Sequence, residues 1–221
     1  IIRRYEKEIA HWVSEPDRGI SDAFNKGIRA ATGEIVGFLN SQDYYFTERS
    51  IERVVRAFRE NPGREIVYGK AYYVPVDSSV VVGVMGEPFT REAMRKRNII
   101  PHQSAFLKRG VFDRHGPYRL DYRFAMDYEH LLRVTSLYHP LFLDEGLAVM
   151  WLGGISDTRK FRVSDELYRA QREHGVGLPS ALATLLSNSL ASAGGRLLRA
   201  FGVYTLGQLL RKAGLVKDEW R

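Results

Sequence analysis

The sequence predicts an α/β fold: one sheet with at least some parallel strand pairing, flanked by helices and followed by a helical appendage. Short apolar runs alternate with amphipathic stretches as far as residue 151, a pattern typical of α/β sheets. Glycine, proline and asparagine separate these runs, as expected for turns. After Gly175 the composition changes to few charges and many leucine, alanine, serine and glycine residues.

The elements of the first half follow from hydrophobic periodicity and from capping residues. Apolar residues at helical spacing predict helices, and short apolar runs between turn residues predict buried strands. Thr47 has the chemistry of an N-cap, and Gly33 that of a C-terminal cap. In order, we expect the tail of a helix over 1–12, a loop at 14–19, a helix over 20–31, a strand over 34–39, a helix from Thr47 to 60, a stop at 61–63 and a strand over 66–68.

The second half is less regular. Residues 71–90 are rich in valine and predict extended or hairpin structure. In order, we then expect a strand over 104–107, a helix over 126–137, short strands at 141–143 and 147–151 around a Glu145–Gly146 turn, a loop at 153–156 and a helix over 157–174. Two units follow from the change in composition: a domain over 1–175 and a helical appendage over 176–221.

The composition restricts the classes of function. The 221 residues contain no cysteine, which excludes disulfides and thiolate metal sites, and no run of eighteen apolar residues. The net charge of +7 is compatible with nucleic acid, an anionic membrane or a phosphorylated substrate as the partner. The densest basic runs are REAMRKR at 91–97 and DTRKFR at 157–162. Each run by itself is typical of a solvated surface, and no interleaved basic and aromatic motif indicates nucleic acid.

Asp43 is the first candidate functional residue. It follows the apolar run that ends at Leu39, within the sequence NSQD at 40–43. Ligands of open α/β sheets collect beyond the carboxyl ends of the strands, where a carboxylate suits Mg²⁺ or Mn²⁺. The alternative is a turn aspartate that caps the following helix, and this fragment alone favours that alternative.

Asp127 is the second candidate, at the start of the helix predicted from MDYEHLLRV. There it is either a general base at the edge of a cleft or an aspartate stabilised by the helix dipole. His102 and Gln103 form a polar pair before a predicted strand. An isolated histidine is more often structural or exposed than catalytic.

Taken together and in this order, the motifs resemble the family 2 inverting glycosyltransferases of the GT-A fold, and most closely bacterial members that build cell-surface polysaccharides. The motifs are the stretch from Ser14 to Asp43, HQSAFLKRGVFDRHGPY at 102–118, MDYEHLLR at 126–133 and GGIS at 153–156. The resemblance covers about two thirds of the chain. It implies a mixed, mainly parallel sheet, a nucleoside-diphosphate sugar as donor, a saccharide or lipid-linked saccharide as acceptor, and no nucleic acid.

The resemblance also implies roles for individual residues. Asp127 matches the catalytic base, and Asp43 the residue that contacts Mn²⁺ or Mg²⁺ and the diphosphate. Gln42 stands where an aspartate is usual, so it brings a hydrogen-bonding group to the donor side but no charge. The remaining matches are Asp17, Asn25 and Lys26 on the donor side, and His102, Gln103, Tyr128 and Gly154 on the acceptor or diphosphate side.

Two further expectations concern the ends of the chain. Family members begin with two strands that hold the nucleotide base, and nothing similar precedes Ile1, so we expect the sequence to lack its start. In 176–221, six basic residues against two acidic ones accompany leucines at roughly helical spacing. The segment either docks a cytoplasmic protein on the inner face of a membrane or packs on the catalytic domain or a second subunit. A rival to the enzyme reading is a non-catalytic nucleotide-sugar-binding module.

Overall fold

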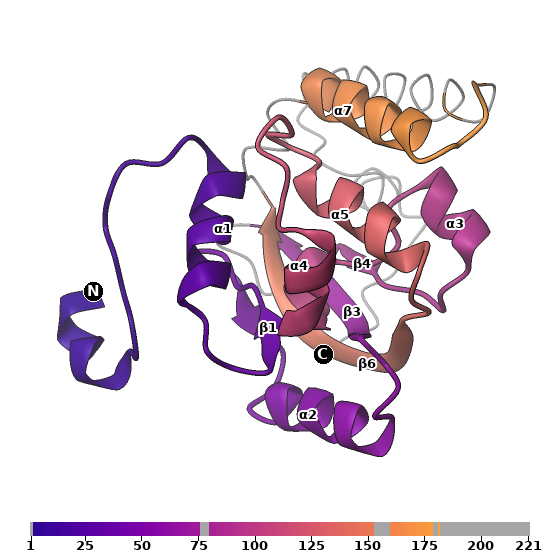
Figure 1. Cartoon of the computed structure of the whole chain (residues 1–221). Coiled ribbons are helices and arrows are strands. Elements are labelled where there is room, and N and C mark those ends of the chain that lie inside the picture. The colour runs from indigo at the N-terminus through magenta and orange to yellow at the C-terminus, as the bar shows by residue number, and fades with distance from the viewer. Residues whose placement is uncertain (1, 76–79, 153–159, 179–180, 182–221) are drawn as a thin grey trace, which may run out of the picture.

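The computed structural model describes residues 2–75, 80–152, 160–178 and 181, and it has the predicted α/β class (Figure 1). Its six-stranded sheet has the order β1-β5-β3-β6-β2, with β4 paired to β3. The strands are β1 (Ile35–Gly37), β2 (Tyr44–Tyr45), β3 (Ile66–Pro75), β4 (Gly83–Met85), β5 (Ala105–Lys108) and β6 (Leu141–Leu152). The described helices are η1 (Ile2–Glu8), α1 (Ile20–Ala30), α2 (Ser50–Glu60), α3 (Arg91–Lys96), η2 (His102–Ser104), α4 (Arg109–His115), α5 (Met126–Thr135) and α7 (Lys160–Glu173).

The expectation of a mainly parallel sheet is wrong for the described strands. Of their pairings, only β3 with β6 is parallel, and the four others are antiparallel. β5 accounts for two of the antiparallel pairings, because it lies between β1 and β3 and runs antiparallel to both. β1 and β3 therefore share a direction, but they are not neighbours in the sheet.

Two layers of helices cover the sheet. Alternate residues of β3 point to opposite faces, so Ile66 and Tyr68 enter one core while Val67 enters the other. The larger core joins the sheet to α1, α3, α4, α5 and α7, and the smaller core joins it to α2 through Val54 and Phe58. Figure 1 shows α2 separated from the group formed by α4, α5 and α7.

The predicted turn at Glu145–Gly146 is also wrong, because residues 141–152 form the single strand β6. The strand pairs with β3 along nearly its whole length, with a shift of register near Lys70 and Gly146. A Cβ on Gly146 would lie 2.3 Å from the Tyr72 ring. The glycine therefore marks a close approach inside a bulged strand, which has the same sequence signature as a turn.

Other boundaries differ by a few residues. The predicted strand at 66–68 extends to Pro75, and its continuation forms the expected hairpin with β4. The helix expected from Thr47 begins at Ser50, and the Thr47 N–H instead donates to the Ser50 hydroxyl at 3.1 Å. None of the helices in the described ranges combines the length and the hydropathy that a bilayer-spanning helix needs.

Candidate active site

Asp43 lies in a tight turn between β1 and β2. Its backbone N–H donates to the Asn40 carbonyl at 3.1 Å, and Gln42 adopts a left-handed conformation with φ of 76°. The turn brings the half-buried Asp43 carboxylate to the end of β6, where the Trp151 N–H donates to Oδ1 at 3.1 Å. The local sequence therefore fixes the turn, and β6 fixes the orientation of the carboxylate.

Gln103 holds the other oxygen of this carboxylate. Its Nε2 donates to Asp43 Oδ2 at 2.8 Å, and the side chain is buried. Its Oε1 is also buried and has no hydrogen-bond partner in the part of the chain that the structure describes. A buried acceptor without a donor costs about 1–3 kcal/mol, so such atoms often mark the place of a ligand or water. Gln103 thus orients Asp43 and presents a second oxygen beside it.

His102, which directly precedes Gln103, is buried. Its ring stacks on Phe38, with ring centres 5.0 Å apart, and its Nε2 is 2.8 Å from the Tyr118 hydroxyl. Burial lowers the pKa of His102, while the charges of Asp127 and Asp43 act in the opposite direction. Since the pKa remains below its usual value of 6.5, the imidazole is neutral at pH 7.

Tyr118 is the hydrogen-bond partner of this histidine. Burial, assisted by the negative charge of Asp127, raises the pKa of Tyr118 well above its usual value of 10. The phenol and the imidazole of His102 therefore form a neutral hydrogen-bonded pair. Asp43 and Asp127 are 84 positions apart in the sequence, and the short segment 98–103 contacts both, Asp127 through Asn98 and Asp43 through Gln103.

Asp127 is the second residue of α5, where the helix dipole stabilises a negative charge. The half-buried carboxylate accepts a hydrogen bond from Asn98 Nδ2 at 3.3 Å through Oδ2. Among the residues with a described position, none donates to its Oδ1. Asp127 is therefore a fixed carboxylate with one oxygen available to accept a proton.

Three of the four predicted donor-side residues, Asp17, Asn25 and Lys26, make hydrogen bonds to other groups of the protein. Asn25 uses its whole amide on Tyr118, donating to the carbonyl at 2.8 Å and accepting from the N–H at 2.9 Å. Lys26 Nζ donates to the Pro16 carbonyl at 2.8 Å, and Asp17 accepts from the Gly19 N–H at 2.7 Å. These contacts give Asn25 a positioning role, because it holds the residue that holds His102.

The structure does not place the Tyr128 hydroxyl or Gly154 beside Asp43 or Asp127: the hydroxyl contacts α3, and Gly154 is not described. The Tyr128 hydroxyl is buried and donates to the carbonyls of Met94 and Arg95 at 2.9 and 3.1 Å. It joins α5 to α3, on a side of the helix different from that of Asp127. Gly154 lies outside the described residues. Gln42 is exposed in the turn beside Asp43.

Three contributors were missed by the sequence prediction. Asn98 orients Asp127, Tyr118 binds His102, and the backbone N–H of Trp151 binds Asp43. Asn98 gave one weak signal, as a polar residue between a helix and the buried pair Ile99–Ile100. Tyr118 closes the motif at 102–118 that begins with His102, but the hydrogen bond between the two side chains depends on the fold of the segment between them.

The residues around Asp43 suit a divalent ion that is shared with a phosphate. Within the described ranges, no group of three or more acidic or histidine side chains is placed to form an all-protein site. Mg²⁺ and Mn²⁺ bound with a diphosphate need only one or two carboxylates, because phosphate oxygens and water complete the shell. The Asp43 carboxylate, with the unpartnered Gln103 Oε1 beside it, meets that need.

Similar sequences are glycosyltransferases. An uncharacterized glycosyltransferase of Mycobacterium tuberculosis is 32% identical over 139 residues, which are 62% of this chain and 52% of that protein. A PGL/p-HBAD biosynthesis glycosyltransferase of Mycobacterium bovis is 28% identical over 158 residues, which are 69% and 58% of the two chains. The chain thus spans little more than half the length of these relatives.

Similar folds occur in solved glycosyltransferase structures. The mannosyltransferase PcManGT of Pyrobaculum calidifontis, in complex with GDP-Man and Mn²⁺, has a TM-score of 0.59 at 18% identity, over 96% of this chain and 65% of that one. Residues 1–349 of S. aureus TarS, in complex with UDP, have a TM-score of 0.53 at 15% identity, over 78% and 51%. Residues 1–127, more than half of this chain, match the pattern of Glycosyl transferase family 2. The chain belongs to that family.

Proposed function

We propose that the protein transfers a sugar, with inversion, from a nucleoside-diphosphate donor to a hydroxyl group of a saccharide or lipid-linked saccharide. The observation that carries the proposal is that one short segment, 98–103, holds both carboxylates, Asp127 through Asn98 and Asp43 through Gln103. Membership of the family supports the reaction class, and the UDP and GDP-Man complexes of the similar structures support the donor class.

In this mechanism Asp127 is the general base. Its free Oδ1 takes the proton of the acceptor hydroxyl while that oxygen attacks the anomeric carbon from the face opposite the diphosphate. The bond between the anomeric carbon and the diphosphate oxygen breaks, and its electron pair leaves with the diphosphate. Asn98 holds Asp127 in the required direction through its 3.3 Å hydrogen bond.

Asp43 serves the donor side. Its carboxylate, oriented by Gln103 and by the Trp151 N–H, would hold Mn²⁺ or Mg²⁺. Such an ion, when bound, offsets negative charge on the leaving diphosphate. Because His102 and Tyr118 are both neutral, this pair does not form an ion pair with either aspartate.

The place of action is also a proposal. We infer a cytoplasmic enzyme that meets its acceptor at the inner face of the membrane, supported by the basic and leucine-rich segment 176–221. The competing role of that segment is packing on the catalytic domain or on a second subunit. Flotation with anionic vesicles at low and high salt separates the two, because only electrostatic docking weakens with salt.

The experiment that tests the function compares wild type with Asp127→Asn in the natural full-length protein. Transfer from a panel of nucleotide sugars is measured with Mn²⁺, and donor binding is measured separately. We expect the variant to lose on the order of 10²- to 10⁴-fold in rate while donor affinity stays within about twofold. Wild-type turnover in the variant would remove Asp127 from the mechanism. Donor binding without turnover in either protein would favour a non-catalytic nucleotide-sugar-binding module.

A further inference from the structure

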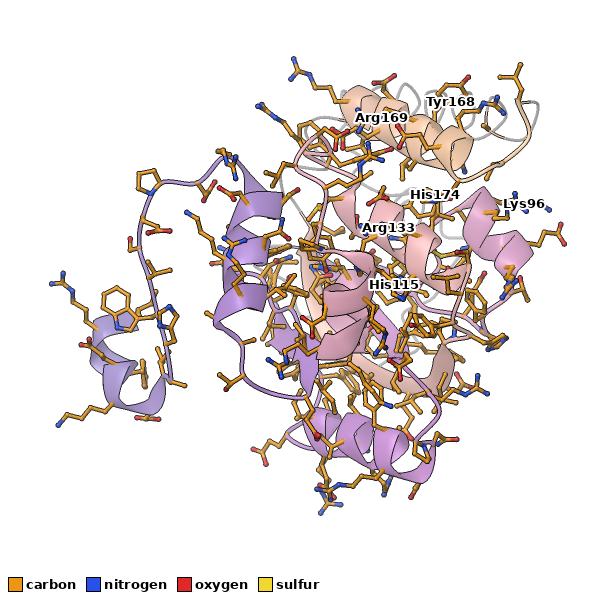
Figure 2. The ribbon with its side chains drawn as sticks, in the orientation of Figure 1. Lys96, His115, Arg133, Tyr168, Arg169 and His174 are labelled. Carbon is orange, nitrogen blue, oxygen red and sulfur yellow. The ribbon has the colours of Figure 1, made fainter. Side chains whose placement is uncertain are left out.

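The basic run at 91–97 forms α3, which packs beside the C-terminal half of α5 and the turn after α7. Figure 2 shows Lys96 of α3 and His174 of that turn on the same side of the molecule. A cavity of about 320 Å³ lies between these elements, within the size range of small-molecule sites. It is lined by Arg91, Arg95, Thr135 and His174, above an apolar floor that includes Met94 and Leu132.

Two guanidinium groups of this cavity have no acidic partner among the residues placed by the structure. Arg91 makes no ion pair or hydrogen bond with them. Arg95 donates to the Gly175 carbonyl, which is neutral. Both arginines also line an adjoining cavity of about 410 Å³ that opens toward Lys96. The two positive charges therefore line both cavities.

The acidic side chains nearby are already paired. Glu92 forms an ion pair with Lys96 at 2.5 Å. Glu129 is buried and accepts from Arg133 at 3.2 Å and from His174 Nε2 at 3.1 Å. Neither carboxylate is left to neutralise Arg91 or Arg95, so the cavity is positively charged.

Two smaller groups add hydrogen-bonding capacity. Thr135 is only 3% exposed, and its hydroxyl has no partner among the described residues although it lines the cavity. His174 uses Nε2 on Glu129, which leaves Nδ1 as its second ring nitrogen. The planar guanidinium groups of the arginines and the threonine hydroxyl are hydrogen-bond donors, and the oxygens of a phosphate group can accept several hydrogen bonds at once.

We propose that this cavity between α3, α5 and the turn after α7 binds a phosphate-bearing group. It is separate from the candidate active site, since Asp127 and Thr135 are eight residues apart on α5, or about 12 Å along the axis. It is connected to that site by α3, because Asn98 follows the helix closely and contacts Asp127. The proposal does not depend on the glycosyl-transfer mechanism, and the ligand is either a free phosphate compound or a lipid headgroup.

Calorimetric titration of the full chain with inorganic pyrophosphate in EDTA tests the site, because the chelator excludes metal-dependent binding at Asp43. The test variant is Arg91→Gln with Arg95→Gln. The matched control is Arg56→Gln with Arg59→Gln, two exposed arginines of α2 on the other side of the sheet. We expect wild type and control to bind equally, and the test variant to bind at least about tenfold more weakly.

The single variant Arg91→Gln is the control for misfolding, because Arg91 makes no hydrogen bond or ion pair with the described residues and the substitution therefore removes none. It should weaken binding without changing the midpoint of thermal unfolding. The proposal is overturned if wild type does not bind pyrophosphate. It is also overturned if both double variants are weakened equally, because general surface charge would then explain the affinity.

A second arm identifies the source of the phosphate. Sedimentation is measured with vesicles of phosphatidylcholine, with and without phosphatidic acid. If the Arg91 and Arg95 substitutions reduce binding to phosphatidic acid vesicles and the α2 control does not, the ligand is a lipid headgroup. If they reduce only pyrophosphate binding, the ligand is a phosphate compound outside the membrane. Equal pyrophosphate and vesicle binding in all proteins contradicts the site.

Discussion

The side-chain amide of Gln103 donates a hydrogen bond to Asp43 Oδ2 at 2.8 Å, across 60 positions of sequence. Gln103 is buried in η2, whereas Asp43 lies in a surface turn with a left-handed residue beside it. Gln103 is held in place by the core, so this hydrogen bond restrains rotation of the Asp43 carboxylate, which the turn by itself would not restrain. A metal or a diphosphate would meet Asp43 already oriented.

Gln103→Ala should weaken Mn²⁺ binding in the presence of a nucleoside diphosphate by about 10- to 100-fold, the usual effect of losing a group that orients a metal ligand. Asn98→Ala is the matched comparison, because it removes the amide that orients Asp127 instead. It should lower the transfer rate and leave Mn²⁺ affinity unchanged. Calorimetry and initial rates measure the two effects, and equal loss of affinity in both variants would refute the separate roles.

Gln42→Asp should tighten Mn²⁺ binding by adding a second charged oxygen beside Asp43. Gln42→Asn is the control, because asparagine and aspartate have the same size and both tolerate the φ of 76° at this position. Asp43→Ala should abolish metal-dependent binding of the nucleotide. Calorimetric titration with Mn²⁺ compares the three, and identical affinities for the Asp and Asn variants would show that the turn does not hold the ion.

Asn25→Ala should destabilise the fold, because it leaves the N–H and the carbonyl of buried Tyr118 without partners. The expected loss is about 2–6 kcal/mol in the free energy of unfolding, at about 1–3 kcal/mol for each of the two unsatisfied groups. Asn61→Ala removes a single 3.0 Å bond to the Ala57 carbonyl at a helix end and should cost less than about 1 kcal/mol. Urea denaturation measures both, and similar losses would contradict the special position of Asn25.

His130 should make the protein less stable in acid. Burial and the charge of Arg133 lower the pKa of its imidazole from 6.5 to about 3. The unfolded chain then binds a proton below pH 6.5 that the folded chain refuses, so stability is lost as pH falls from about 6.5 toward 3. Burial lowers the pKa of His102 as well, which acts in the same direction.

His130→Phe replaces the imidazole with a ring that can keep the stacking on Phe112, where the ring centres are 4.9 Å apart. The free energy of unfolding is measured in urea between about pH 7 and pH 4. Its slope against pH should be smaller in this variant, by the equivalent of up to one bound proton. An unchanged slope would mean that His130 is not the residue that titrates.

The sequence alone determined the class of fold and the order of most elements, and it singled out Asp43 and Asp127 as candidates whose roles remain predictions. Hydrophobic periodicity is a local property, so α1, α2 and α5 were predicted to within a few residues. The turn at Asp43 was equally local, because asparagine, serine, glutamine and aspartate after an apolar run cannot continue a buried strand.

Tertiary structure decided the rest. The pairing of β5 between β1 and β3, and the continuity of β6 through Gly146, depend on which strands meet, and a local pattern does not contain that information. The same holds for the contacts of Asp43 with Gln103 and of Asp127 with Asn98, which join residues 60 and 29 positions apart. A hydrogen bond is set by distance and angle in space, so only the packed sheet and helices could show which polar side chains orient the two carboxylates.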